Sequence, residues 1–162
     1  MEKITVSDLQ NLQSDSNVIQ YVMISAGDEY FGIDIKYIDN IVRYQHVTRI
    51  PKAQKYFKGV INLRGEIISV MNLRSKLGIP EIDITKNTRI IILKPEEDTS
   101  VGIIVDEIKE VINLHEGDIE KSNTSDNGEI KGSYLDGIGK YDNMLISLLN
   151  IQNLIIEKDV MN

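Results

Sequence analysis

The chain has 162 residues, of which 41% are hydrophobic and 27% charged, enough to bury the core of one domain or of two small lobes. Its net charge of −7 argues against binding to nucleic acid or to an anionic membrane, because both depend on clustered Lys and Arg. It contains no cysteine, which excludes disulfides, thiolate metal sites and cysteine nucleophiles.

The beginning of the chain carries no targeting pattern. No run of about 18 apolar residues occurs anywhere in the sequence, and residues 1–17 are polar rather than signal-like. We therefore expect a cytoplasmic protein without direct membrane insertion. We also expect a flexible N-terminal leader over residues 1–16, a folded domain over 17–157 and a C-terminal tail over 158–162.

The first half of the chain predicts short strands joined by turns. Residues 18–24 and 30–35 are apolar runs separated by the turn residues 27–29. Residues 60–63 and 66–71 are a second pair of β-branched runs, which meet at Arg64 and Gly65. Leu73, Leu77 and the following Gly78 predict a single helical turn that ends at the glycine.

The second half repeats this pattern of short elements. A hairpin is expected from residues 89–93 and 100–105, with the turn within 95–99, and residues 122–132 form one long polar loop. Asp142 and Asn143 turn the chain into a strand over 144–149. Asn150 then caps a C-terminal helix whose apolar residues have helical spacing.

Two blocks of sequence occur twice in the same order. FGIDIKYIDNIVR (31–43) aligns with VGIIVDEIKEVIN (101–113) without a gap, and Gly32 matches Gly102. GVINLRGEIISVMNL (59–73) aligns with GIGKYDNMLISLLNI (137–151), and Gly59 matches Gly137. The duplication predicts a mostly β protein with two related lobes, closed or nearly closed, that share an apolar seam. A seam of this kind is a natural place for a partner to insert.

The sequence offers no set of residues typical of catalysis. His46 and His115 are far apart along the chain and lack the ligands or partners of a zinc site or a triad. Asp106, Glu107 and Glu110 form either an acidic group or a solvated strand end. We therefore predict a binding protein that is not an enzyme and needs no metal or cofactor.

GVINLRGEIISVMNLR, with FGIDIKYIDNIVRYQHVTRIP before it and VGIIVDEIKEV and YLDGIGKYDNMLISLLNI after it, resembles the CheW family of chemotaxis coupling proteins. The resemblance extends from about Val18 to Ile156. It implies two five-stranded SH3-like β-barrel subdomains with a short C-terminal helix. It also implies a non-catalytic adaptor that couples the cytoplasmic tips of transmembrane chemoreceptors to the regulatory domain of the histidine kinase CheA.

The resemblance also suggests which residues contact the partners. The positions that it implies in receptor binding are Ile38, Asn40, Thr48, Gly59 and Arg64. For the kinase it suggests, more loosely, three residues of the first lobe for which core packing is the alternative role: Tyr30, Ile33 and Ile41.

The turn at Arg64 and Gly65 explains why a polar pair interrupts an apolar hairpin. Glycine permits a backbone turn that most residues resist, and arginine can present a rigid charged fork to carboxylates or carbonyl groups of a partner. Asp142 and Asn143 occupy these positions in the repeat, so the second lobe is expected to keep the hairpin but not the cation.

Two amides, Asn40 and Asn72, stand where the family usually has carboxylates, which puts the strength of receptor binding in question. Two other functional classes stay open. One is a related adaptor module of a CheV-type or kinase-associated system. The other is a small barrel that binds a ligand or has enzymatic activity.

Overall fold

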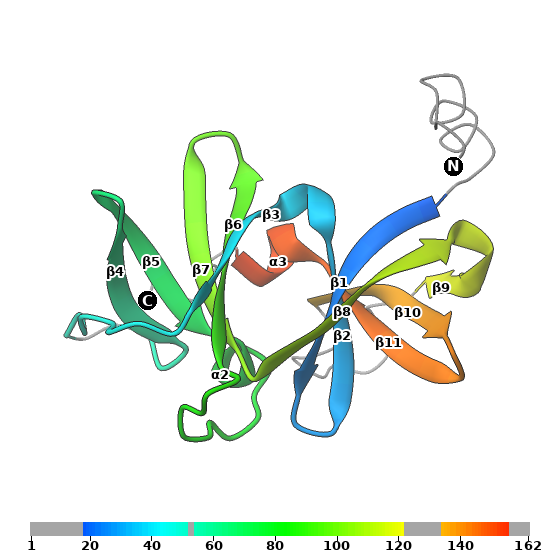
Figure 1. Cartoon of the computed structure of the whole chain (residues 1–162), viewed down its shortest axis with the longest axis horizontal. Coiled ribbons are helices and arrows are strands. Elements are labelled where there is room, and N and C mark those ends of the chain that lie inside the picture. Colours follow the sequence, from blue (N-terminus) through cyan, green and yellow to red (C-terminus); the bar gives the residue numbers. More distant parts are fainter. Residues whose placement is uncertain (1–17, 52–53, 122–133, 156–162) are drawn as a thin grey trace, which may run out of the picture.

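The computed structural model describes residues 18–51, 54–121 and 134–155, which form a six-stranded and a five-stranded sheet with short helical pieces (Figure 1). The predicted mostly β fold is therefore confirmed. The expected leader, the polar loop over 122–132 and the C-terminal tail lie outside the described residues. None of the described helices is long and apolar enough to span a membrane.

We call the five-stranded sheet lobe I. It has the strand order β3-β6-β7-β5-β4. Its strands are β3 (Ile38–Arg43), β4 (Phe57–Leu63), β5 (Glu66–Asn72), β6 (Arg89–Glu96) and β7 (Thr99–Val105). The predicted hairpins β4–β5 and β6–β7 are both present as antiparallel pairs.

We call the six-stranded sheet lobe II. It has the order β8-β1-β2-β11-β10-β9 and takes strands from both halves of the chain. Its strands are β1 (Val18–Ala26), β2 (Glu29–Asp34), β8 (Glu107–His115), β9 (Ile119–Lys121), β10 (Leu135–Tyr141) and β11 (Met144–Leu149). The helical pieces are η1 (Ile35–Tyr37), α2 (Leu73–Lys76), η2 (Glu116–Asp118) and α3 (Ile151–Ile155).

The two lobes repeat one topology, as the duplicated sequence predicts. The order β3-β6-β7-β5-β4 of lobe I corresponds strand by strand to β8-β1-β2-β11-β10 of lobe II. Each lobe contains a parallel pair, and its register is conserved: Ser69 lies opposite Val101 in lobe I, and Ser147 lies opposite Phe31 in lobe II. The duplication therefore extends to the pairing of individual residues.

The lobes do not coincide with the two halves of the sequence. The chain crosses from lobe II to lobe I between β2 and β3, and it crosses back between β7 and β8. Tyr30 and Ile33, expected on the first lobe, therefore belong to the sheet of lobe II. The reason is that β2 pairs with β1 and β11 rather than with the strands that directly follow it.

The apolar seam between the lobes is present. Odd and even positions of β6 face different cores: Ile90 and Ile92 pack inside lobe I, whereas Ile91 and Leu93 belong to the central cluster at the seam. Strand β1 is buried on both faces in the same way. A strand covered on both faces needs a continuous apolar run, which explains the sequence RIIIL at residues 89–93.

The two lobes are consistent with the expected SH3-like barrels, closed or nearly closed, although the pairing of the described residues closes neither sheet completely. Strands β3 and β4 are the two ends of the sheet in lobe I, and the chain that joins them makes a single bridge, between Thr48 and Val60. In lobe II the corresponding contact is the short ladder between β9 and β10. Both sheets therefore stay open, because only these short pairings approach the end strands.

The two α-helices of the described residues begin at equivalent asparagines. The Oδ1 atom of Asn72 accepts a hydrogen bond from the backbone of Ser75, and that of Asn150 accepts one from Asn153. The predicted cap of the C-terminal helix is thus confirmed. Gly78, at φ +79°, closes the turn after α2. In Figure 1, α3 lies between the two sheets, and its buried residues Ile151 and Leu154 belong to the central cluster.

Candidate functional site

The β4–β5 hairpin places Arg64 at its tip. Leu63 pairs with Glu66, so Arg64 and Gly65 are the two loop residues, and both have positive φ (54° and 84°). Positive φ at both loop positions is the type I′ turn, whose twist matches that of the strands. The Asn62 side chain accepts a hydrogen bond from the Gly65 N–H at 2.9 Å and supports the turn.

Arg64 itself is exposed to solvent. Within residues 18–51, 54–121 and 134–155, no hydrogen bond or ion pair engages its guanidinium group. The turn therefore depends on the backbone and on Asn62, while the charged fork is left available for another molecule.

The equivalent hairpin of lobe II keeps the turn and reverses the charge. Asp142 and Asn143 have φ values of 50° and 64°, and they join β10 to β11 where Tyr141 pairs with Met144. The prediction that the second lobe keeps the hairpin but not the cation is confirmed. The two tips are at opposite ends of the molecule (Figure 1).

Thr48 and Gly59, which are distant in the sequence, are in direct contact. The N–H of Thr48 donates to the carbonyl oxygen of Val60 at 2.8 Å, and the N–H of Val60 donates back to the Thr48 carbonyl at 2.9 Å. Gly59 is buried next to this pair. Arg64, in the turn after β4, lies five residues after Gly59. At the rise of an extended strand this separates the two residues by about 17 Å.

Ile38 and Asn40 lie on β3, at the other end of the sheet from β4. Ile38 is half-buried against the central cluster. Asn40 follows a register shift in the pairing of β3 with β6, and its Oδ1 atom accepts a hydrogen bond from the N–H of Ile41 at 2.9 Å. Among the five residues implied in receptor binding, the structure therefore brings only Thr48 and Gly59 together directly.

The three residues suggested for the kinase do not form one surface. Ile33 has no exposed area and packs in the central cluster, which leaves it no side-chain surface for a partner. Tyr30 is half-buried against the core of lobe II. Ile41 is 36% exposed on β3 of lobe I.

Sequence reasoning missed a matched pair of exposed apolar side chains. Ile67 on β5 and Leu145 on β11 are each 63% exposed, and they occupy equivalent positions of the duplicated hairpins. Ile41 and Val111 form a second equivalent pair, 36% and 51% exposed. The sequence could have revealed these pairs. Each position is apolar in both copies of the repeat, yet it faces outward on its strand, where neither core needs an apolar residue.

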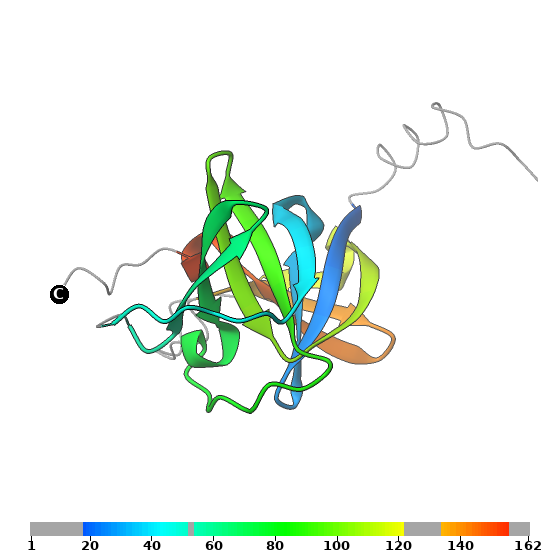
Figure 2. The same cartoon turned by 60° about the vertical axis from the view of Figure 1, so that its left-hand side comes forward.

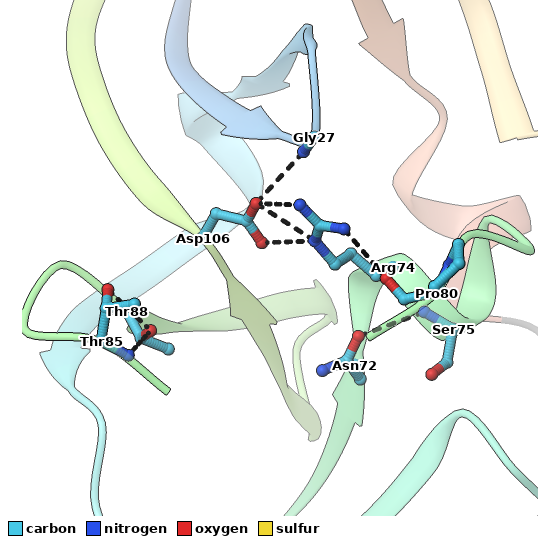
Figure 3. A network of polar contacts seen from close by, with 8 residues as sticks. All are labelled: Gly27, Asn72, Arg74, Ser75, Pro80, Thr85, Thr88 and Asp106. Atoms are coloured by element: carbon cyan, nitrogen blue, oxygen red, sulfur yellow. Dashed lines mark hydrogen bonds and ion pairs between the residues drawn. The ribbon is translucent and has the colours of Figure 1, made fainter. Parts of the chain in front are cut away.

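A second feature missed from the sequence is an ion pair between elements far apart in the chain (Figure 3). The Arg74 guanidinium donates to both carboxylate oxygens of Asp106, with its Nη2 atom 2.8 Å from Oδ2. Asp106 also accepts the N–H of Gly27 from the β1–β2 turn, and Arg74 donates to the carbonyl of Pro80. Hydrogen bonding to Asp106 raises the pKa of Arg74 above its ordinary value. Asp106 thus joins α2 of lobe I to lobe II.

Glu81 makes a smaller polar cluster in the chain that follows α2. It accepts a hydrogen bond from the Ser75 hydroxyl and forms an ion pair with Lys58, whose Nζ lies 2.6 Å from its Oε1. Partial burial acts to raise the pKa of Glu81, but the hydrogen bonds from Lys58 and Ser75 outweigh it and leave the pKa below its ordinary value.

The acidic and histidine side chains do not assemble into a metal-binding cluster within the described part of the chain. His46 and His115 are exposed. Of the three carboxylates near the β7–β8 crossing, Asp106 is engaged by Arg74, and Glu110 accepts a hydrogen bond from the Tyr141 hydroxyl at 3.2 Å.

Two open sheets of the same topology, packed on a shared core and carrying their distinctive side chains on outer hairpins, define a duplicated β scaffold. The family model for the CheW-like domain matches residues 20–159. The chain therefore belongs to the CheW-like family, a family of scaffold proteins in chemotaxis.

Individual relatives agree with this assignment. The chain is 37% identical over 138 residues to a chemotaxis protein CheW of Bacillus subtilis, covering 85% of this chain and 86% of the relative. It is 32% identical over 149 residues to a CheW of Helicobacter pylori, covering 91% and 87%. The crystal structure of the scaffolding protein TtCheW from Thermoanaerobacter tengcongensis superimposes with a TM-score of 0.79 at 31% identity, covering 88% of this chain and 97% of that protein.

Proposed function

We propose that the protein is a non-catalytic adaptor that couples the cytoplasmic tips of membrane chemoreceptors to the regulatory domain of the histidine kinase CheA. Lobe I contributes the receptor-binding side through Arg64, Thr48 and Gly59, with Ile38 and Asn40 on β3. The adaptor works in the cytoplasm, where both partners present these parts, and it reaches the receptor arrays through them.

The observation that carries the proposal is the backbone conformation of Arg64 together with the exposure of its side chain. The tip of the β4–β5 hairpin, in the left-handed conformation, carries an exposed cation that makes no hydrogen bond or ion pair within the described residues. Non-glycine residues adopt positive φ at a cost, and the equivalent hairpin of lobe II forms the same turn without a cation. The arginine is thus not needed for the turn, which favours a role in binding an acidic or carbonyl-rich partner surface.

The matched apolar pairs support the kinase side of the proposal. Each lobe exposes a large apolar residue on its hairpin, Ile67 in lobe I and Leu145 in lobe II. A single exposed apolar side chain is ordinary, but here the equivalent hairpin position is apolar and exposed in both lobes, which favours a shared role in pairing. A kinase domain of the same fold would offer equivalent positions, so these residues, together with Tyr30 and Ile41, are the proposed contacts for pairing lobe to lobe.

The proposal is tested by titrating the purified chain separately with a CheA regulatory domain and with a receptor cytoplasmic fragment. Arg64→Ala should weaken binding to the receptor fragment and leave binding to the kinase domain within about twofold. Leu145→Asp should weaken binding to the kinase domain alone, because it places a charge in an apolar contact. Wild-type protein that binds neither partner would refute the adaptor function.

The absence of catalysis is tested in the same preparations. We expect no turnover of nucleotide or of common ester substrates, and binding of CheA without added metal. Hydrolysis that survives repurification and disappears with a point substitution would instead establish an enzyme.

A further inference from the structure

Gly59 is a position at which a side chain cannot be accommodated. Its φ is +141°, in a region that residues with a Cβ rarely adopt. A Cβ added there would lie 1.9 Å from the carbonyl oxygen of Thr48 and 2.7 Å from its carbonyl carbon. Both are backbone atoms, which cannot swing aside as the end of a long side chain can.

The backbone that would be displaced is the attachment point of the chain between β3 and β4. The chain leaving β3 runs outward along lobe I before it returns as β4 (Figure 2). In its described part it is joined to β4 by the reciprocal hydrogen bonds of Thr48 and Val60, and it is anchored by the buried side chain of Val47. From the bridge onward three residues in a row are exposed: Thr48, Arg49 and Ile50. Ile50 is 45% exposed.

We infer that Gly59 is a positioning residue, which acts on the receptor by holding the segment Thr48–Ile50 against β4. The inference rests on the proposed function, in which Thr48 belongs to the receptor-binding surface. Gly59 is buried and has no side chain, so it offers a partner almost no contact area of its own. A larger residue at position 59 would push the Thr48 carbonyl away from β4 and break the hydrogen bonds between Thr48 and Val60. The segment Thr48–Ile50, which contacts the receptor, would then be released.

Lobe II provides a matched control for the same crowding. A Cβ on Gly137 would lie 2.5 Å from the carbonyl oxygen of Glu120, which occupies the place of Thr48. The corresponding segment there is β9, held by three residue pairs rather than one bridge, and it is remote from the proposed receptor surface. Gly137→Ala therefore introduces a milder clash with a backbone carbonyl, without the positive φ of Gly59, and leaves the segment Thr48–Ile50 undisturbed.

The experiment measures binding to a receptor cytoplasmic fragment together with hydrogen exchange of the Thr48 amide. Gly59→Ala should weaken binding by about tenfold or more, and should speed Thr48 exchange by a similar factor, because a strained backbone of this kind disfavours the closed bridge. Gly137→Ala should leave both quantities within about twofold of wild type. In a Thr48→Ala background the effect of Gly59→Ala on binding should shrink, because both substitutions act on one contact.

A second variant covers the case in which Gly59→Ala does not fold. Val60→Pro removes the N–H that donates to Thr48 while keeping Gly59, and it should also weaken receptor binding and speed Thr48 exchange. Loss of binding on Gly59→Ala with Thr48 still protected would overturn the inference, as would normal binding by Val60→Pro when Thr48 exchanges freely. If wild-type protein does not bind the receptor fragment, the proposed function fails instead, and the exchange data alone decide whether Gly59 positions the segment.

Discussion

Replacing Arg64 by asparagine separates binding from folding, because it deletes the cation and keeps the turn. Arg64 has φ 54°, and asparagine followed by glycine is the preferred pair for a type I′ turn. The substitution removes no hydrogen bond or ion pair of the guanidinium to the described residues, so Arg64→Asn should leave the free energy of unfolding unchanged or raise it by less than about 1 kcal/mol. A lost charge-assisted contact at the partner should cost about 1.5–3 kcal/mol, roughly a tenfold to 150-fold loss of affinity.

The assay combines calorimetric titration of a receptor cytoplasmic fragment with urea unfolding of each variant. Asp142→Asn is the control, because it makes a similar change in the equivalent turn of lobe II, where we expect the same small effect on stability and unchanged receptor affinity. Receptor affinity equal to that of wild type would refute the binding role of Arg64. A loss of stability well above 1 kcal/mol would show instead that Arg64 holds the fold.

The remaining predictions concern three other polar groups. Arg74→Ala and Asp106→Asn should each destabilise the protein by about 2–3 kcal/mol, as measured by urea unfolding. The double variant should lose clearly less than the sum of the two single losses, because the residues form one ion pair. Additive losses would mean that the two residues do not act as a pair. Because the folded pKa of Glu81 is lowered from its ordinary 4.5, its stabilising contribution is present above that value and is lost as the pH falls through the folded pKa. Glu81→Gln should therefore flatten the acid limb of the stability profile, and an unchanged limb would contradict this. Asn40→Glu should tighten receptor binding while changing stability by no more than about 0.5 kcal/mol, whereas equal or weaker binding would mean that the receptor is adapted to the amide.

The local elements of the protein could be predicted because their signals are short. The turns at Arg64–Gly65 and at Asp142–Asn143, the cap at Asn150, and the β-branched runs each depend on a few adjacent residues. Strand β3 was not predicted as a strand, because its sequence IDNIVR interrupts the apolar alternation with charged and amide residues. Its place is decided by pairing with β6.

The placement of the candidate site residues depended on tertiary contacts. Ile33 and Ile41 are both isoleucines in the same repeat block, yet one is fully buried at the seam and the other is exposed on an end strand. The contact of Thr48 with Gly59 and the pairing of Arg74 with Asp106 join residues with many others between them. Neither contact leaves a pattern in the neighbouring sequence.

The sequence by itself determined the duplication, the two hairpin turns and the exposed cation on only one of them. These follow from the residue types, since glycine and asparagine tolerate positive φ and arginine stays charged. Only the tertiary structure decided that β1 and β2 join the sheet of the second half while β6 and β7 join that of the first, that the sheets stay open, and that Gly59 lies against Thr48. The physical reason is that strand exchange and long-range pairing are selected by how the whole apolar surface is buried at the seam, a property that no single segment carries.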